Sequence, residues 1–243
     1  MIVLIITAVR VKSMDSHRIS GRILAENIAG PGMLRLVEQS MQAQAQKTSV
    51  TEIAVKEWKH PQAALTFDDG PDIRYTPLLL DGLKERNVRV SFFLLGEKVE
   101  QYPELVERMQ KEGHLVGNHT YHHVQLNKLN ETKAREEILK TNNLIYETTG
   151  VYPLYLRPPF GAWKKNLELC VEMLPVFWTI DTLDWKVQNT EKIVRTVQEQ
   201  IEDGAIILMH DEYDTSVEAA LQVVDELKNQ GYELVTVDQL ILP

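Results

Sequence analysis

Residues of the types that bind metals or move protons gather in five short blocks that lie far apart in this sequence. The blocks are residues 66–71, 119–123, 157–161, 181–185 and 208–211. Together they supply an aspartate pair, a histidine pair, an arginine, a further aspartate and a distant histidine. Such side chains could hold a cation, take a proton from water and return one to a leaving group. That combination is the chemistry of a metal-activated hydrolase.

The aspartate and histidine pairs are the candidates for a metal site. Asp68 and Asp69 directly follow an apolar run, so their side chains should diverge and serve different tasks, although Asp-Gly-Pro is also strong turn chemistry. On a helical turn, the spacing of His119 and His123 places both imidazoles on one face, within reach of one cation. Zinc sites commonly use three protein ligands, which predicts Asp69 as the third. His122 is a rival ligand that points in another direction, and an isolated His-x-x-x-His pattern also fits solvated or buried histidines.

The three later blocks contain candidate residues for charge stabilisation and proton transfer. A guanidinium at Arg157 beside Asp68 would hold that carboxylate ionised and oriented, and the two prolines that follow suit an amide N–H aimed at an oxyanion. A structural salt bridge is the alternative. His210 has an intrinsic pKa suited to proton transfer near neutrality, and a neighbouring carboxylate would raise it. Trp185 can wall an apolar pocket or simply pack in the core. No block decides alone; the order and composition of all five carry the interpretation.

A regular alternation of elements would bring these blocks together. Apolar runs predict strands at residues 63–67, 88–95, 114–117, 154–156, 176–180, 205–209 and 234–237. Helices are predicted at residues 75–85, 103–111, 132–147, 165–173, 190–201 and 217–229. About seven strands alternating with helices predict an α/β fold with a parallel sheet, closed as a barrel or open and doubly wound. In barrels of this type the site lies at the carboxyl ends of the strands, where the five blocks begin.

Composition narrows the classes of function. A net charge of -9 and a pI near 5.3 argue against a nucleic-acid-binding surface. The single cysteine, Cys170, cannot form an intrachain disulfide, and its apolar surroundings predict a buried small hydrophobe. Residues 2–9 are apolar but too few for a membrane span of roughly 20 residues. No clear signal peptide is evident, and a truncated anchor stays open.

The domain organisation follows from where the blocks lie. Residues 1–60 contain no chemistry-bearing cluster and are predicted to be an N-terminal extension, a linker or a truncated anchor, with a helix at residues 33–46. Residues 61–243 are predicted to form the domain that carries all five blocks.

The five blocks resemble, in the same order, the five motifs of polysaccharide deacetylases with a NodB-type domain, which form carbohydrate esterase family four. The matching residues are Thr66-Phe-Asp-Asp-Gly70, His119-Thr-x-x-His123, Arg157-x-Pro-Phe-Gly161, Asp181-x-x-Asp184-Trp185 and Leu208-x-His210. The resemblance covers residues 62–240 and is specific through the five motifs jointly. It implies a distorted (β/α) barrel, usually short of eight strands.

The resemblance also implies a metal centre and a base. Asp69, His119 and His123 would be the ligands of one divalent metal ion, with zinc as the expected ion. Asp68 would be the general base, and Arg157 would position it.

The resemblance assigns the remaining motif residues to the acid and the substrate pocket. His210 would be the general acid, tuned by Asp184. The backbone N–H of Phe160, where many members have tyrosine, would stabilise the oxyanion. Trp185 and Leu208 would form the slot for an acetyl methyl group.

The implied reaction is hydrolysis of the N-acetyl group of an amino sugar in a glycan, with release of acetate. Peptidoglycan and chitooligosaccharides carry the same acetamide, and a bacterial-looking domain with a truncated anchor favours peptidoglycan and the cell envelope. An O-acetyl esterase acting on xylan or another acetylated carbohydrate is the first alternative. A non-catalytic glycan-binding protein is the second, although such a protein would be expected to lose Asp68, a ligand or His210. No protein partner and no nucleic acid is implied.

Overall fold

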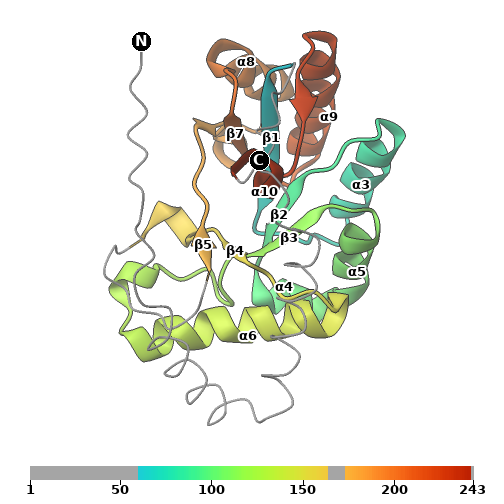
Figure 1. Cartoon of the computed structure of the whole chain (residues 1–243). Helices are drawn as coiled ribbons and strands as arrows, with labels where there is room; N and C mark the ends of the chain where they lie inside the picture. The colour runs from blue at the N-terminus through green and yellow to red at the C-terminus, as the bar shows by residue number, and fades with distance from the viewer. Residues whose placement is uncertain (1–59, 164–172, 242–243) are drawn as a thin grey trace, which may run out of the picture. The chain divides into compact units, whose positions relative to one another are not determined.

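The computed structural model describes residues 60–163 and 173–241 (Figure 1). The predicted helix at residues 33–46, Cys170 and nearly all of the predicted helix at residues 165–173 lie outside the described residues.

A parallel β-sheet forms the centre of the described part. Its strands are β1 (Gln62–Asp68), β2 (Ser91–Leu94), β3 (Leu115–Asn118), β4 (Tyr155–Leu156), β5 (Leu174–Pro175), β6 (Ile180–Asp181), β7 (Ala205–His210) and β8 (Glu233–Leu234). The order β5-β4-β3-β2-β1-β7-β6 forms one path, and β8 pairs with β1 off that path. The path of seven strands curls into a half-barrel, which confirms the predicted α/β distorted barrel.

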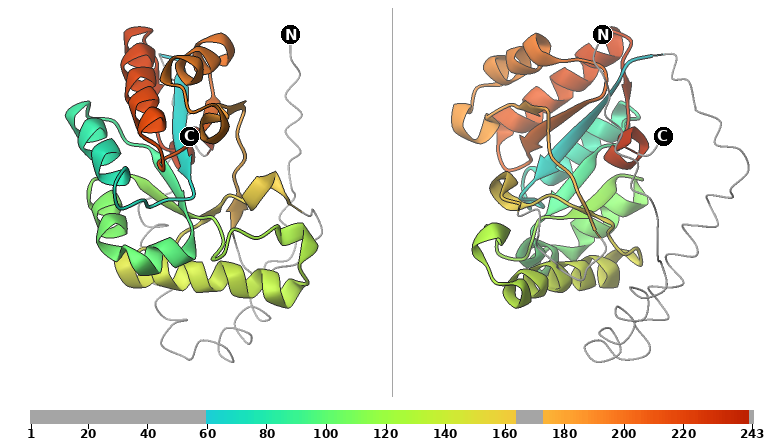
Figure 2. Two further views of the ribbon diagram at one scale, coloured as in Figure 1. Left: turned by 180° about the vertical axis from the view of Figure 1, so that it is seen from behind. Right: turned by 60° about the vertical axis from the view of Figure 1, so that its left-hand side comes forward.

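Helices cover one face of this sheet (Figures 1 and 2). The described helices are α3 (Thr76–Glu85), α4 (Gly96–Gln101), α5 (Pro103–Lys111), α6 (Glu131–Thr149), α7 (Asp184–Val187), α8 (Thr190–Gln200), α9 (Asp214–Asn229) and α10 (Val237–Ile241). Neighbouring helices pack on one another in the order α8, α9, α3, α5 and α6, so they form a continuous outer layer. Helix α10 lies apart from this layer, because its Val237 packs in one core cluster with Ala64 of β1. None of the described helices combines the length and the apolar character that crossing a membrane requires.

The pleat of β1 sends alternate side chains to two environments. Leu65 and Phe67 belong to the large core cluster beneath the helices, whereas Ala64 belongs to a second cluster on the opposite face of the sheet. Because side chains alternate along a strand, Thr66 and Asp68 share the face of Ala64. That face is the inside of the half-barrel.

The neighbouring strand β7 repeats the pattern. Ile207 and Met209 pack in the large cluster, whereas Ile206 packs against the inner one. Leu208 and His210 therefore point to the inside of the half-barrel, beside Thr66 and Asp68 of β1.

The prediction of a single strand at residues 176–180 is wrong. Val176 N–H donates to the carbonyl of Leu156 at 2.8 Å, whereas Thr179 N–H donates to the carbonyl of Ile206 at 2.9 Å. The segment therefore leaves the β4 edge of the sheet and reaches the β7 edge within four residues. It cannot pair along its length with one neighbour, and so β5 and β6 are separate two-residue strands at opposite ends of the path.

Two further differences concern short elements. The strand predicted at residues 234–237 ends at Leu234, and α10 begins at Val237. The helices α4 and α7 were not predicted, because six and four residues are too few to show a helical period.

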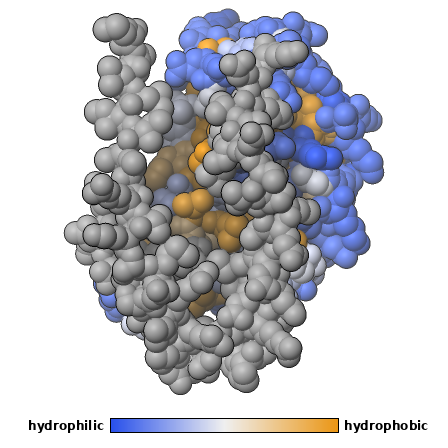
Figure 3. Space-filling view, in the orientation of Figure 1, coloured by the Kyte–Doolittle hydropathy of each residue, from blue (hydrophilic) through white to orange (hydrophobic). Residues whose placement is uncertain are grey.

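On the surface, hydrophilic residues gather over the outer helices, and hydrophobic residues lie in the middle of the face seen in Figure 3.

Candidate active site and metal centre

The paired strands β1 and β7 bring two of the sequence blocks together. Their parallel register places Thr66 opposite Leu208 and Asp68 opposite His210. All four side chains lie on the inner face of the sheet, at the carboxyl ends of the two strands. The candidate base and the candidate acid are therefore neighbours across one strand pair.

Arg157 lies fully buried behind Asp68. Its Nη1 donates to the carboxylate of Asp68 at 2.8 Å and lies 2.6 Å from the hydroxyl oxygen of Thr66. The guanidinium carbon is 4.2 Å from the ring centroid of Phe93, which faces the same interior from β2. The guanidinium thus fixes one carboxylate oxygen of Asp68, in agreement with the predicted contact.

Burial raises the pKa of Asp68, while the charge and the hydrogen bond of Arg157 act to lower it. The predicted effect of the arginine is present, but burial is larger and the net direction is upward. An upward shift moves the carboxylate toward the range in which a general base works well near neutral pH.

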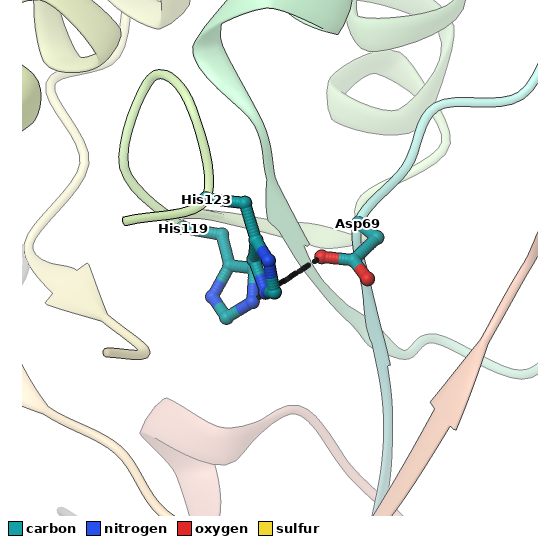
Figure 4. A group of neighbouring side chains, drawn as sticks. All are labelled: Asp69, His119 and His123. Carbon is teal, nitrogen blue, oxygen red and sulfur yellow. Dashed lines mark ion pairs between the residues drawn. The ribbon is translucent and has the colours of Figure 1, made fainter. Parts of the chain in front are cut away.

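Asp69, His119 and His123 converge on one point (Figure 4). Oδ1 of Asp69 lies 3.4 Å from Nε2 of each histidine, and one ligand atom from each of the three residues falls within 4.8 Å of the others. Among the described residues, this buried oxygen has no hydrogen-bond partner. A carboxylate and two imidazoles are a donor set that suits zinc and related divalent ions. The three residues therefore fit a metal ion.

A hydrogen bond sets the tautomer of His119. Its Nδ1 lies 2.6 Å from the carbonyl oxygen of Arg157. A carbonyl only accepts, so Nδ1 carries the proton and Nε2 is left as the free donor atom toward Asp69. Burial lowers the pKa of His119 to about 3, which keeps the imidazole neutral and available as a ligand near neutral pH.

The His119–His123 segment is a turn rather than the predicted helical turn. Thr120 and His123 have φ angles of 67° and 54°, in the left-handed region that a right-handed helix excludes. The prediction that both imidazoles reach one point is confirmed, but the backbone geometry behind it was wrong. The rival ligand His122 instead points to Glu137, with Nδ1 2.8 Å from the carboxylate.

The carboxylate of Asp184 contacts both the backbone and the ring of His210. One carboxylate oxygen accepts the backbone N–H of His210 at 2.8 Å, and the other lies 2.8 Å from Nδ1 of its ring. Burial disfavours the charged imidazole, but the hydrogen bond and the charge of Asp184 outweigh it and raise the pKa of His210 to about 9. His210 is therefore protonated near neutral pH and can donate a proton from Nε2.

The three predicted pocket residues lie around these groups with different exposure. Leu208 is buried beside Thr66, whereas Trp185 in α7 is 49% exposed and Phe160 is 62% exposed. The ring of Phe160 lies 4.5 Å from the ring of His123, between centroids, and its φ is 59°. The backbone thus turns sharply at Phe160, beside the group of Asp69, His119 and His123.

Left-handed backbone is concentrated at this edge of the sheet. Non-glycine residues with positive φ in the site loops are Asp69, Thr120, His123, Phe160 and Leu183. Each belongs to one of the four blocks that precede β7. This backbone is less favourable for residues with a Cβ and marks a site held in one conformation by its surroundings.

Three further residues contribute to this site, and the sequence predicted no role for any of them. Thr66 and Phe93 contact the guanidinium of Arg157, and Asn118 at the end of β3 accepts the N–H of Thr120 at 2.6 Å. Each lies on a strand that leads into the site. A polar residue within an otherwise apolar strand was the available signal for Thr66 and Asn118; Phe93 gave none.

Comparison with known proteins agrees with this geometry. Residues 56–176 match the family model for polysaccharide deacetylase. The peptidoglycan-N-acetylglucosamine deacetylase PgdA of Listeria monocytogenes is 43% identical over 177 residues, which cover 73% of this chain and 38% of the relative. A peptidoglycan-N-acetylglucosamine deacetylase of Bacillus cereus is 40% identical over 186 residues, covering 74% of this chain and 68% of the relative.

A solved structure extends the comparison to the fold. The structure of the peptidoglycan deacetylase PdaC of Bacillus subtilis matches with a TM-score of 0.73 and 42% identity, and the match covers 75% of this chain and 91% of that structure. The chain spans 38% of the length of PgdA, well under half of that relative. With the family model, the relatives and the fold in agreement, the chain belongs to the polysaccharide deacetylase family.

Proposed function

We propose that this chain is a metal-dependent N-deacetylase that removes acetyl groups from the amino sugars of peptidoglycan, and that residues 61–243 form its catalytic domain. The observation that carries the proposal is the meeting of two groups at one sheet edge. The Asp69, His119 and His123 group lies beside Asp68 and His210, which are paired across β1 and β7.

Asp69, His119 and His123 would hold the metal ion, and zinc is the ion proposed. A divalent ion there supplies Lewis acidity, which polarises a carbonyl and lowers the pKa of water. The tautomer of His119, fixed by the carbonyl of Arg157, leaves Nε2 free for this task.

Three residues of the chain, Asp68, Phe160 and His210, perform the remaining steps. Asp68, held by Arg157, takes the proton of the attacking water. The backbone N–H of Phe160 stabilises the oxyanion that forms from the acetyl carbonyl. His210, protonated and held by Asp184, gives its Nε2 proton to the departing amine nitrogen. Trp185 and Leu208 border the space for the acetyl methyl group.

Peptidoglycan is the proposed substrate because of the relatives, and the cell envelope is the proposed location. The names of those relatives include both N-acetylglucosamine and N-acetylmuramic acid deacetylases at 43% identity, so identity does not separate the two sugars. The exposed aromatic rings of Phe160 and Trp185 provide surfaces on which a sugar ring could stack.

Acetate release tests the proposal. The chelator-treated protein, with and without added Zn²⁺, is incubated with purified peptidoglycan and with N-acetylglucosamine oligomers. We expect release that depends on Zn²⁺ and is faster on peptidoglycan. Equal activity after chelation would overturn the metal-dependent mechanism, and cleavage of acetyl esters without cleavage of the acetamides would identify an esterase.

Substitution of the base separates chemistry from metal binding. Asp68→Asn should lower kcat by about a hundredfold or more, because a positioned base contributes roughly 10² to 10⁴ in rate. Its zinc content should equal that of the wild type, as Asp68 is not among the three ligands. His119→Ala should instead lose zinc. Near-normal turnover by Asp68→Asn would contradict the assignment of the base.

A further inference from the structure

The turn that carries both histidine ligands lies against helix α6. At its start, the side-chain amide of Asn118 donates to the carbonyl of Ile138 at 2.9 Å and to Oδ1 of Asn142 at 2.6 Å. Its own Oδ1 accepts the N–H of Thr120. Two residues of α6 thus hold the end of β3, from which His119 follows directly.

One carboxylate of α6 holds the middle of the same turn. Oε2 of Glu137 accepts the N–H of Tyr121 at 3.0 Å and the N–H of His122 at 2.9 Å. Oε1 accepts from Nδ1 of His122 at 2.8 Å. The side chain of Glu137 is 15% exposed, whereas that of His122 is 59% exposed, so the carboxylate is largely enclosed and the imidazole covers it from the solvent side.

The turn needs such restraint because its backbone is unfavourable. Thr120 and His123, on either side of the two amides that Glu137 binds, have left-handed φ angles. Relaxation of either residue would rotate the chain between His119 and His123. The spacing of their Nε2 atoms relative to Asp69 would then change, since those atoms share one oxygen at 3.4 Å.

We propose that Glu137 is a positioning residue of the metal centre, which holds the His119–His123 turn in the form that binds the ion. The inference rests on the metal site proposed above. It also gives His122 a role: this histidine completes the contact with Glu137 and is thereby directed away from the ion. Partners of this kind, one step removed from the metal, typically change its affinity by about 10- to 100-fold.

The test measures zinc affinity in the absence of substrate. The full chain is stripped of metal, and the Kd for Zn²⁺ is measured by competition with a chromophoric chelator, alongside the Tm of the metal-free protein. Glu137→Ala should weaken binding by about 10- to 100-fold. Glu137→Gln should recover most of the affinity, because its side-chain oxygen still accepts the two backbone N–H groups. Glu136→Ala, at the exposed neighbour on α6, serves as the matched control and should bind like the wild type.

Activity supplies a second readout. Turnover by Glu137→Ala should require more Zn²⁺ for half-saturation yet approach the wild-type kcat once the site is filled. A wild-type Kd in Glu137→Ala would overturn the inference. If that variant does not fold, Glu137→Asp decides, since it keeps the charge but is too short to reach both amides; a wild-type Kd there would also overturn it. Failure of the wild type to bind Zn²⁺ would instead refute the proposed metal site.

Discussion

The contact between Asp184 and His210 decides which protonation state the histidine has near neutral pH. Both carboxylate oxygens are used, one on the backbone N–H and one on the ring. The same hydrogen bonds lower the pKa of Asp184 despite its burial. The pair therefore consists of a positively charged imidazolium, with a proton on each ring nitrogen, and a negatively charged carboxylate, which is the state that an acid catalyst requires.

Removing that charge should narrow the pH range of activity. In Asp184→Asn the imidazole loses its counter-charge, and its pKa should fall by about one unit or more. Because the proposed reaction needs protonated His210, the alkaline limb of kcat/KM against pH should move to lower pH by the same amount.

The measurement is a pH profile at saturating Zn²⁺, with Asp214→Asn as the control at an exposed carboxylate of the neighbouring helix α9. An unchanged alkaline limb in Asp184→Asn would show that His210 does not set it.

At the scale of elements, the turn after β1 depends on the residue that follows β7. A Cβ added to Gly70 would lie 2.5 Å from Oδ1 of Asp211, closer than atoms can approach. Asp211 is fully buried and accepts a hydrogen bond from the hydroxyl of Thr76, which in turn accepts the N–H of Asp72 at 2.7 Å. This chain of contacts ties the start of α3 to the end of β7 and leaves no room at Gly70.

Gly70→Ala should therefore destabilise the fold by about 1–3 kcal/mol, the usual cost of overpacking. In an Asp211→Ala background the same substitution should cost less, because the obstructing carboxylate is gone. Urea unfolding of the wild type, both single variants and the double variant measures this coupling. Equal costs of Gly70→Ala in both backgrounds would show that the contact with Asp211 is not the cause.

The elements also show what the sequence could and could not predict. Helix α5 has the predicted bounds, β1 is longer than predicted by one residue at each end, and β7 by one residue at its carboxyl end, since apolar runs and turn residues mark these elements clearly. The segment 176–180 looks like a strand because its residues suit one, yet it crosses between two sheet edges. Pairing partners are a property of the whole sheet and leave no trace in a local pattern.

The candidate site likewise has features that the sequence could predict and features that it could not. The sequence predicted that Asp69, His119 and His123 form a possible metal site and that Asp68 and His210 lie near it, because the types and order of residues in the blocks are specific. The backbone of the His119–His123 turn was not predicted, since left-handed angles at Thr120 and His123 depend on contacts with α6. The role of Glu137 could not be predicted either, because a glutamate within a helix usually faces solvent.

At the scale of the whole molecule, two of the buried groups that link stability to pH are Asp211 and His210. Burial raises the pKa of Asp211 to about 7, and Asp184 raises the pKa of His210 to about 9 against the opposing effect of burial. In both cases the folded protein holds a proton more tightly than the unfolded chain does. Their contributions to stability are therefore complete at low pH and are lost as pH rises through the folded-state values.

The contribution of Asp211 to the stability of the metal-free protein should consequently fall between about pH 4 and 7, where the unfolded chain has lost this proton and the folded protein still holds it. Asp211→Asn keeps the size and an oxygen acceptor for Thr76 but does not titrate. Its free energy of unfolding lacks the contribution that the wild type loses over this range. The stability of the variant relative to the wild type should therefore increase as pH rises. Urea unfolding at several pH values in the presence of chelator measures the difference. Parallel pH dependences would contradict the role of Asp211.

The left-handed backbone at Asp69 and His123 has a consequence for engineering. Glycine adopts such angles without steric cost, so replacing either residue by glycine should relieve strain while removing a proposed metal ligand. Selection of a library for heat resistance alone would thus enrich variants that are more thermostable than the wild type but have lost catalytic activity. Selection for thermostable forms of this protein needs an activity screen in every round, or those two positions held fixed.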